Sequence, residues 1–343
     1  MDTKALRYFN AVAEFGSYSR GAEFLRLSQP ALSRQITRLE QELGTALFRR
    51  NGHGITLTDA GRTLLARSQL ILRQIEQTRD EVRGGAGGLA GTVTLGVPPA
   101  AGTYLVPSLY RRFVAEHPRV ALKIVGGYSS YIHEWLVRGQ VDLACLHDPL
   151  PQRGFEIVPL VQEPVFVVGR SGSFPAGMGS VRTAELAQLP LILPGRPNAS
   201  RRLLDGWMAE HHLTLSLRME VDDPSIIRAM LRAGHGFSVL SRGSVDTELR
   251  HGELEARPLS PPASWQLALV LPAHGVRPPI VTALAETIVK VAHEETAAGS
   301  WPGRGQRSSI AKERFGRNSR PGDDRDRAAA DCPNAKQLRS AEA

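Results

Sequence analysis

The chain has 343 residues, of which 42% are hydrophobic and 22% charged, a balance typical of a globular protein with two or three domains. It contains no uncharged apolar run of about 18 residues and no apolar segment near its start, so we expect neither a membrane span nor a secretory signal. The two cysteines, Cys145 and Cys332, lie far apart. This predicts a cytoplasmic location and a buried, inert thiol at Cys145.

The formal net charge of +8 is concentrated at the two ends of the chain. Residues 1–83 hold 13 Lys and Arg against 9 Asp and Glu, and residues 297–343 hold 10 against 6. The 213 residues between them hold 19 of each kind. A basic amino-terminal module beside a neutral middle indicates that the first part binds nucleic acid.

Three short helices are predicted in the first 44 residues. A first helix should end near Gly16, and a second, capped by Ser19, should close at Leu27. Ser28 stands where the N-cap of the third belongs, and Pro30 falls in its first turn, where a missing N–H costs nothing. These signals place a tight turn between the second and third helices.

The third helix has one apolar and one polar face. The apolar stripe recurs at helical spacing and consists of Leu32, Ile36, Leu39 and Leu43. The polar face carries side chains that can reach base edges and phosphates, namely Gln29, Ser33, Arg34, Thr37 and Arg38. An ordinary amphipathic surface helix would show the same pattern, but its neighbours favour DNA recognition. Asn51-Gly52 is a typical turn of a β-hairpin and follows the basic residues Arg49 and Arg50. Three helices and a basic hairpin predict that residues 1–58 form a winged helix-turn-helix.

A long helix is expected over residues 59–83, with Thr58 as its N-cap. Its apolar residues fall near a 3.5-residue repeat, interrupted at Ser68 and Arg79. A solitary helix of this kind is marginal, so we expect it to pair with a second subunit. The glycine-rich residues 84–91 read as a hinge.

Short β-rich runs alternate with helical patterns from residue 92 onward, which predicts βαβ units and parallel sheets. We expect an α/β domain with two lobes and a cleft between them. Lobe I comprises residues 92–163 and 269–296, and lobe II comprises residues 164–268. Apolar periodicity is lost near Gly299, so residues 297–343 are predicted to be a disordered basic tail.

The motifs of residues 6–62 resemble those of LysR-type transcriptional regulators. They include Ser-Gln-Pro-Ala-Leu-Ser, the pair Leu39-Glu40, Phe48-Arg49-Arg50 and Leu57-Thr58-x-Ala60-Gly61. The stretches GVPPAAGTYLVP and GGYSSYIHEWLVRGQVDLACLHD are similar to the branch of nitrogen assimilation control regulators. The resemblance implies an effector domain similar to a type 2 periplasmic binding protein, assembly into dimers and tetramers, and DNA bending at an interrupted inverted repeat.

The resemblance also implies that Ser33 and Arg34 reach base edges, with Gln29 and Pro30 at the entrance of the groove. Arg34 can bind guanine through two parallel hydrogen bonds, and Gln29 can bind adenine in the same way. Phosphate contacts are expected from Arg38, Arg49 and Arg50. The predicted DNA-binding set is Ser28, Gln29, Pro30, Ser33, Arg34, Thr37, Arg38, Arg49 and Arg50.

A small-molecule effector should bind at the turns that follow the carboxyl ends of the strands. The candidate effector residues there are Pro98, Ala100, Thr103, Ser129, Ser130, Asp148, Asn198, Arg201, Asp223 and Ser225. Arg196 and Arg201 could hold a carboxylate, or could be plain surface residues. Where the family often has hydroxyls in the first turn, this chain has Pro98-Pro99-Ala100-Ala101, which argues against a small anionic effector, or against any effector at all.

Three functions remain open from the sequence. The leading one is a DNA-binding regulator that responds to a metabolite, with RNA polymerase as a further candidate partner. The second is an effector-independent, DNA-bending regulator with a structural cleft. The third is an enzyme or solute-binding protein on the two-lobed fold, but no catalytic constellation, metal spacing or cofactor motif supports it.

Overall fold

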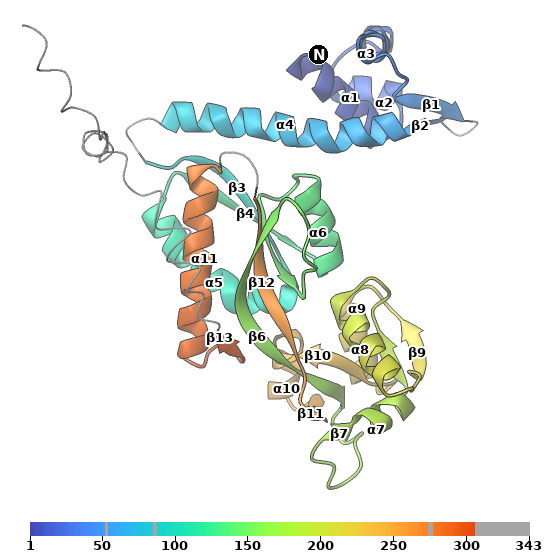
Figure 1. The fold of residues 1–343 in the computed structure, drawn as a ribbon, viewed down its shortest axis with the longest axis vertical. Helices are drawn as coiled ribbons and strands as arrows, with labels where there is room; N and C mark the ends of the chain where they lie inside the picture. Colours follow the sequence, from blue (N-terminus) through green and yellow to red (C-terminus); the bar gives the residue numbers. More distant parts are fainter. Residues whose placement is uncertain (52–53, 85–87, 274–276, 306–343) are drawn as a thin grey trace, which may run out of the picture. The chain divides into compact units, whose positions relative to one another are not determined.

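A computed structural model describes residues 1–51, 54–84, 88–273 and 277–305. The amino-terminal part consists of α1 (Thr3–Phe15), α2 (Tyr18–Phe24), α3 (Gln29–Leu43), β1 (Phe48–Asn51) and β2 (Gly54–Leu57). The two strands pair antiparallel, with Phe48 opposite Leu57. Leu32, Ile36 and Leu39 of the predicted apolar stripe pack in a buried cluster with Phe9 and Val12 of α1, whereas Leu43 at the end of α3 is 39% exposed. This is a winged helix-turn-helix (Figure 1).

Local details of this domain differ from the sequence prediction. The N-cap of α2 is Ser17, whose side chain accepts a hydrogen bond from the Arg20 N–H, and not Ser19. The helix ends at Phe24, three residues before the expected Leu27. Ser28 occupies the N-cap position of α3, but its side chain makes no capping hydrogen bond. The predicted turn at Asn51-Gly52 continues into residues 52–53, outside the described residues.

The long helix α4 (Asp59–Gly84) begins at the cap predicted from the sequence. The Thr58 hydroxyl accepts from the Gly61 N–H at 3.0 Å and donates to the Ala46 carbonyl at 2.7 Å. Ser68 is fully buried and donates to the Asn10 side chain at 2.6 Å. It therefore fastens α4 to α1, which explains a polar residue in the apolar repeat. Residues 85–87 of the predicted hinge lie outside the described residues.

The following domain is built on one mixed sheet with the strand order β4-β3-β5-β12-β6-β11-β7. The strands on this path are β3 (Gly91–Val97), β4 (Val120–Gly126), β5 (Leu143–His147), β6 (Phe155–Arg170), β7 (Val181–Arg182), β11 (Leu254–Ser260) and β12 (Ser264–Pro272). β10 (Ser238–Ser241) and β13 (Arg304–Gly305) also pair with β6, whereas β8 (Leu191–Leu193) and β9 (Leu217–Glu220) pair with each other. The helices are α5 (Pro99–Glu116), α6 (Ser129–Val137), α7 (Thr183–Gln188), α8 (Ala199–Glu210), α9 (Pro224–Arg232), α10 (Asp246–Arg250) and α11 (Pro279–Ala297), with a 3-10 turn at Arg242–Ser244.

The expectation of parallel sheets is wrong for the centre of this domain. β3 is parallel to β4 and β5, but β12 runs antiparallel to both β5 and β6. β6 is 16 residues long and passes through both lobes beside β12 (Figure 1). The sequence pattern predicts only residues 165–168 of this strand, because Pro159 and Pro164 interrupt the apolar run and proline is unusual inside a sheet. The two long strands therefore connect the lobes.

The cysteine predicted to be buried is indeed in the interior of the effector domain. Cys145 is fully buried, and burial raises the pKa of its thiol to about 12, as expected of an inert side chain.

The basic tail does not begin at residue 297, because Trp301 is only 1% exposed and β13 pairs with β6. Residues 306–343, including Cys332, lie outside the described residues. None of the helices within the described ranges has the length and apolar character that crossing a membrane requires.

Candidate functional site

The exposed face of α3 brings most of the predicted DNA-binding residues together. They line a shallow groove on the helix, formed by Gln29, Pro30, Ser33, Arg34, Thr37, Arg38 and Gln41. This face lies opposite the stripe of Leu32, Ile36 and Leu39, which is buried. Burial of one face thus fixes which side chains point outward, as the helical spacing predicted.

The cations of this surface have no acidic partners among the described residues. Arg34, Arg38 and Arg49 are exposed, and none of the three forms an ion pair with a described residue. Arg49 lies on β1, while the side chain of Arg50 is outside what the structure describes. Exposed guanidinium groups without an internal ion-pair partner create a positive potential that suits a phosphate backbone.

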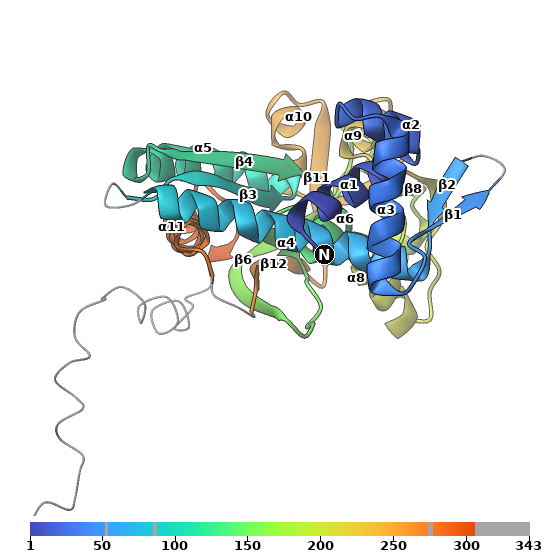
Figure 2. The same cartoon turned by 90° about the horizontal axis from the view of Figure 1, so that it is seen from above.

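Glu40 ties the hairpin to α3, a role that the sequence analysis did not assign. Its Oε1 accepts hydrogen bonds from the backbone N–H groups of Leu47 at 2.7 Å and Phe48 at 3.2 Å. Glu40 belongs to α3 and Phe48 begins β1, two elements that Figure 2 shows from above. The carboxylate therefore sets where the hairpin starts relative to the helix. The only signal for it in the sequence was its place in the family-like Leu39-Glu40 pair.

A cavity of about 750 Å³ lies between the two lobes of the second domain. Four helix starts contribute to its lining: Pro98, Pro99, Ala100 and Thr103 at α5, Tyr128 and Ser129 at α6, Asn198 to Ser200 at α8, and Pro224 at α9. Strand and loop residues complete the lining, among them His147, Leu240 and Trp265. Its size matches the clefts in which proteins bind small molecules.

The structure brings half of the predicted effector residues to this cavity. Those that line it are Pro98, Ala100, Thr103, Ser129 and Asn198. Ser130, Asp148, Arg201, Asp223 and Ser225 are not among the lining residues. Asp223 instead caps α9, and Asp148 accepts a hydrogen bond from the Gln266 backbone N–H at 2.9 Å.

The two arginines considered for a carboxylate are engaged elsewhere. Arg201 pairs with Asp205 and with Glu220, both at 3.1 Å, and Arg196 pairs with Asp205 at 2.7 Å. The cations that do line the cavity are Arg228 and Arg250. They also have partners, since Arg228 pairs with Glu248 at 3.2 Å and Arg250 with Asp246 at 2.6 Å.

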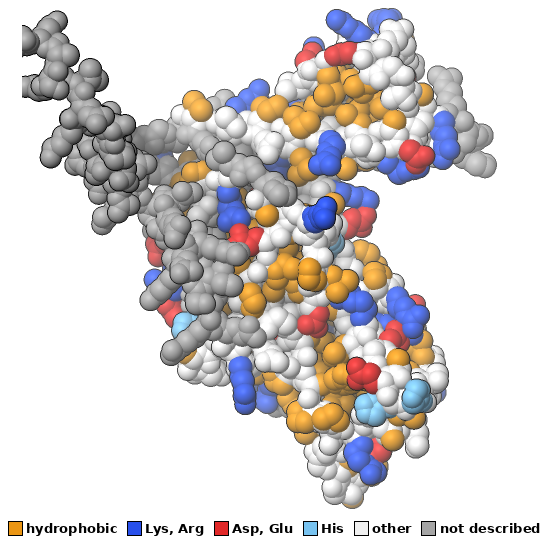
Figure 3. Space-filling model, in the orientation of Figure 1, with side chains coloured by type: hydrophobic (Ala, Val, Ile, Leu, Met, Phe, Trp, Pro, Cys, Tyr) orange, Lys and Arg blue, Asp and Glu red, His pale blue; other side chains and the backbone are white. Residues whose placement is uncertain are grey.

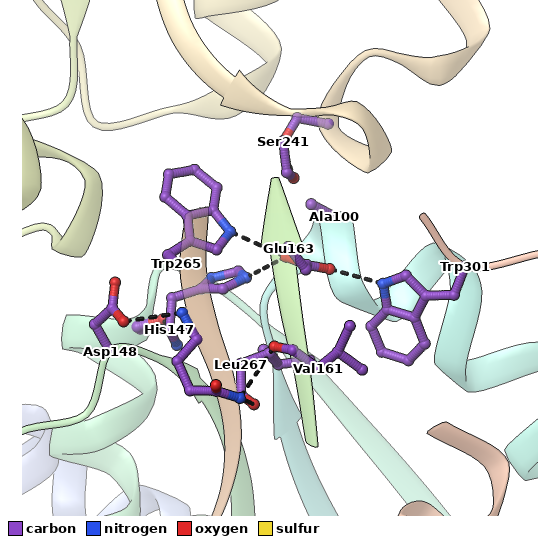
Figure 4. Close-up of polar contacts among 12 residues, drawn as sticks. Ala100, His147, Asp148, Val161, Glu163, Ser241, Trp265, Leu267 and Trp301 are labelled. Carbon is purple, nitrogen blue, oxygen red and sulfur yellow. Dashed lines mark hydrogen bonds and ion pairs between the residues drawn. The ribbon is translucent and has the colours of Figure 1, made fainter. Parts of the chain in front are cut away.

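A buried carboxylate, Glu163, contacts two residues that line the cavity, His147 and Trp265 (Figure 4). Glu163 on β6 is 2% exposed and accepts hydrogen bonds from His147 Nε2 at 2.8 Å, Trp265 Nε1 at 3.0 Å and Trp301 Nε1 at 2.7 Å. Burial alone would raise the pKa of Glu163, but these hydrogen bonds outweigh it and hold the pKa below the usual value. The group is therefore an ionised carboxylate whose charge is compensated by three donors.

The sequence analysis placed the turn at His147 beside the cleft but missed Glu163, Trp265 and Trp301, because these residues lie inside strands or in the supposed tail. His147 ends β5, and Trp265 stands directly opposite Glu163 on β12. In a sequence, aromatic residues within buried strands are first interpreted as core residues. Only the three-dimensional structure shows that these residues lie together. In the parts of the chain that the structure describes, no cluster of three or more His, Cys, Asp or Glu is placed to hold a metal ion.

A basic winged helix-turn-helix joined to a two-lobed domain with a cavity defines a class of DNA-binding regulators. Comparison with known proteins identifies the family. Residues 3–62 match the bacterial regulatory helix-turn-helix protein family model of the lysR family, and residues 86–292 match the LysR substrate binding domain. The chain belongs to the LysR family: it is a LysR-type transcriptional regulator with a DNA-binding domain and an effector-binding domain.

Individual relatives agree with this assignment. The HTH-type transcriptional regulator BbuR of Bordetella bronchiseptica is 31% identical over 304 residues, covering 88% of this chain and 94% of the relative. The nitrogen assimilation regulatory protein nac of Escherichia coli is 31% identical over 295 residues, covering 85% and 95%. Among solved structures, a full-length OxyR variant from Pseudomonas aeruginosa matches with a TM-score of 0.63 at 27% identity, covering 84% of this chain and 94% of that one. Full-length CbnR complexed with its target DNA shares the fold, with a TM-score of 0.63 at 22% identity, over 85% of this chain and 100% of that one.

Proposed function

We propose that α3 and the β1–β2 hairpin read an interrupted inverted repeat upstream of the regulated genes. Arg34, Ser33 and Gln29 meet base edges, whereas Arg38, Arg49 and Arg50 meet phosphates. The observation that carries this proposal is that Arg34, Arg38 and Arg49 are exposed without an ion-pair partner among the described residues, and that Arg34 and Arg38 line the polar groove of α3. The protein acts by binding and not by catalysis, in the cytoplasm, with RNA polymerase as its partner at the promoter.

The test is binding of the purified full chain to the DNA upstream of its own gene. Footprinting locates the protected sites, and fluorescence anisotropy compares a protected duplex with a shuffled duplex of equal composition at about 0.15 M salt. We expect two protected half-sites separated by whole helical turns and a clear preference for the protected sequence. Equal affinity for both duplexes would refute the proposal.

The dimer forms through α4. On the face shown in Figure 3, apolar side chains gather along this helix. Ile71 is 36% and Val82 is 78% exposed in the single chain, on one side of the helix. A second copy would cover these residues, and two dimers make the tetramer. Val82→Asp should shift sedimentation toward monomer, whereas the isosteric Val82→Thr should not; an unchanged profile for the aspartate variant would contradict pairing through this face.

The cavity between the lobes takes a small metabolite that changes DNA binding. Its volume of about 750 Å³, apolar walls and converging helix starts support this assignment. Thermal melting of the full chain across small carboxylates, amino acids and aromatic acids tests it. A compound that binds only the folded state raises the melting temperature in proportion to the logarithm of its concentration.

A second candidate is an effector-independent regulator whose cleft is structural. Pro98 and Pro99 remove two backbone donors at the start of α5, and the cavity arginines Arg228 and Arg250 are already paired. A chain of this kind would show the same footprint with no melting shift from any compound. The melting screen therefore separates the two candidates without affecting the DNA-binding assignment.

A further inference from the structure

The chain beyond the matched effector domain folds back into that domain. The family match ends at residue 292, and α11 ends at Ala297. Gly299 then adopts a left-handed conformation (φ +73°), and the Trp301 backbone N–H donates to the Glu295 carbonyl at 3.1 Å. Residues 304–305 pair antiparallel with β6, opposite Gln162 and Val161. We call residues 298–305 the return segment.

Glycine allows the return segment to lie this close to β6. Gly303 has a φ of +155°, and a side chain there would come within 2.7 Å of Val161 Cγ1 and 2.8 Å of the Gln162 carbonyl. A Cβ at Gly305 would likewise collide with the Thr296 hydroxyl. The sequence Gly-Ser-Trp-Pro-Gly-Arg-Gly is therefore suited to a close approach and not merely to a flexible end.

Trp301 is the side chain that this segment delivers. It is 1% exposed, its ring stacks on Tyr104 with the centroids 5.8 Å apart, and its Nε1 donates to Glu163 Oε1 at 2.7 Å. The other oxygen of Glu163 accepts from His147 and Trp265 (Figure 4). Tyr104, His147 and Trp265 all line the cavity, as does Ser300 of the return segment.

We propose that Trp301 is a positioning residue of the effector cavity. Its indole N–H fixes the Glu163 carboxylate, and the carboxylate in turn fixes the rings of His147 and Trp265 on the cavity wall. Loss of the Trp301 donor leaves Oε1 buried without a partner, so the carboxylate turns and releases its other two contacts. The return segment thereby makes the shape of the cavity depend on chain that lies outside the matched domain. This inference rests on the proposed effector function of the cavity.

Fluorine NMR of the full-length protein labelled with 5-fluorotryptophan tests the proposal without any compound. The four tryptophans, Trp135, Trp207, Trp265 and Trp301, give four resonances that single Phe variants assign. Trp301→Phe keeps a ring beside Tyr104 but removes the N–H. We expect this variant to shift the Trp265 resonance and to leave those of Trp135 and Trp207 in place. Trp135→Phe, which changes a half-buried residue outside the cavity lining, should leave Trp265 unchanged.

An unmoved Trp265 resonance in a folded Trp301→Phe protein would overturn the proposal. Trp301 would then only fill space in the apolar core. Hydrogen exchange of the indole N–H groups in the unmodified protein provides a test that needs no folded variant. The Trp265 and Trp301 protons should exchange far more slowly than those of Trp135 and Trp207. Exchange of Trp301 as fast as that of Trp207 would also overturn the proposal. Failure of the effector function is seen separately, as the absence of any melting shift.

Discussion

The arginines of the DNA-binding surface and those of the effector domain are in opposite electrostatic situations. Arg34 and Arg38 on α3 are exposed and form no ion pair with a described residue. Arg201 in lobe II pairs with both Asp205 and Glu220, and only 12% of its side chain is exposed. Around the cavity, Arg228 and Arg250 are paired as well.

The difference shows where each charge finds its counterion. A guanidinium without an internal partner gains most when a phosphate or a base approaches, so its contribution is to binding. A guanidinium between two carboxylates has already been compensated, so its contribution is to the folded state and little remains for a ligand. Substitutions in the two regions should therefore separate binding from stability.

The largest effect is expected from the buried charge of the effector domain. Glu163→Leu removes the acceptor of three side-chain donors, two of them indoles that are buried. We expect the free energy of unfolding of the effector domain to fall by about 3 kcal/mol, since donors left unpaired in the interior lose their partners without regaining water. Urea unfolding followed by circular dichroism measures the loss. DNA affinity well below the melting temperature should stay unchanged, and a parallel loss of affinity would break the division between the regions.

The contribution of Glu163 to the free energy of unfolding should also depend on pH. The pKa of Glu163 lies below its usual value in the folded protein, so its stabilisation is present at neutral pH and is lost as the pH falls through the lowered pKa. The difference in unfolding free energy between the unmodified protein and Glu163→Gln should therefore be largest near neutrality and should shrink below about pH 4. Urea titrations at several pH values measure it; a difference that grows with acidity would contradict an ionised Glu163.

Arg34→Ala should have the largest effect on binding. Loss of a two-hydrogen-bond contact to guanine costs about 1–3 kcal/mol, or roughly 5- to 150-fold in affinity for the operator. Affinity for a shuffled duplex should change far less. Arg38→Ala is the matched control on the same face: it should weaken both duplexes alike and reduce the salt slope of log K by about 1. Equal loss of specificity in the two variants would refute their separate roles.

Glu40→Ala should have a smaller effect of about 1 kcal/mol, because it removes two hydrogen bonds at the half-buried start of the hairpin. The hairpin then loses its fixed position relative to α3, so affinity for all sequences should fall while the ratio between operator and shuffled duplex is kept. Glu40→Gln retains an acceptor and should restore most of the affinity. Anisotropy at fixed salt measures both, and a change in sequence preference would contradict the positioning role.

The DNA-binding face could be predicted from the sequence more fully than the cavity. The DNA-binding face depends on helical spacing within 15 residues, a local property, so the residues on the α3 face could be chosen from the sequence alone. The cavity depends on contacts between residues far apart in the chain. The turns after strands located five lining residues, but Glu163, Trp265 and Trp301 are brought together from separate segments that no local pattern connects.

The prediction of parallel sheets failed for a related reason. Alternation of strands and helices is a local signal, whereas the direction of β12 between β5 and β6 is set by the return of the chain from lobe II. Composition was similarly misleading at the end of the chain. Gly, Ser, Arg and Pro after α11 are typical of a disordered tail, yet the same glycines permit the close pairing with β6.

Arg201→Ala should have the smallest effect. It tests directly whether an arginine that is paired inside the fold takes no part in binding. Asp205 keeps Arg196 as a partner and Glu220 is half exposed, so the loss of unfolding free energy should be about 1 kcal/mol or less. DNA affinity should not change, because the charge was never available outside the domain. If a compound from the melting screen binds the cavity, its effect should also survive this substitution, since Arg201 does not line it. A variant of normal stability that no longer responds to that compound would show that Arg201 leaves its carboxylates for the effector, and compensation inside the fold would then not exclude a charge from binding.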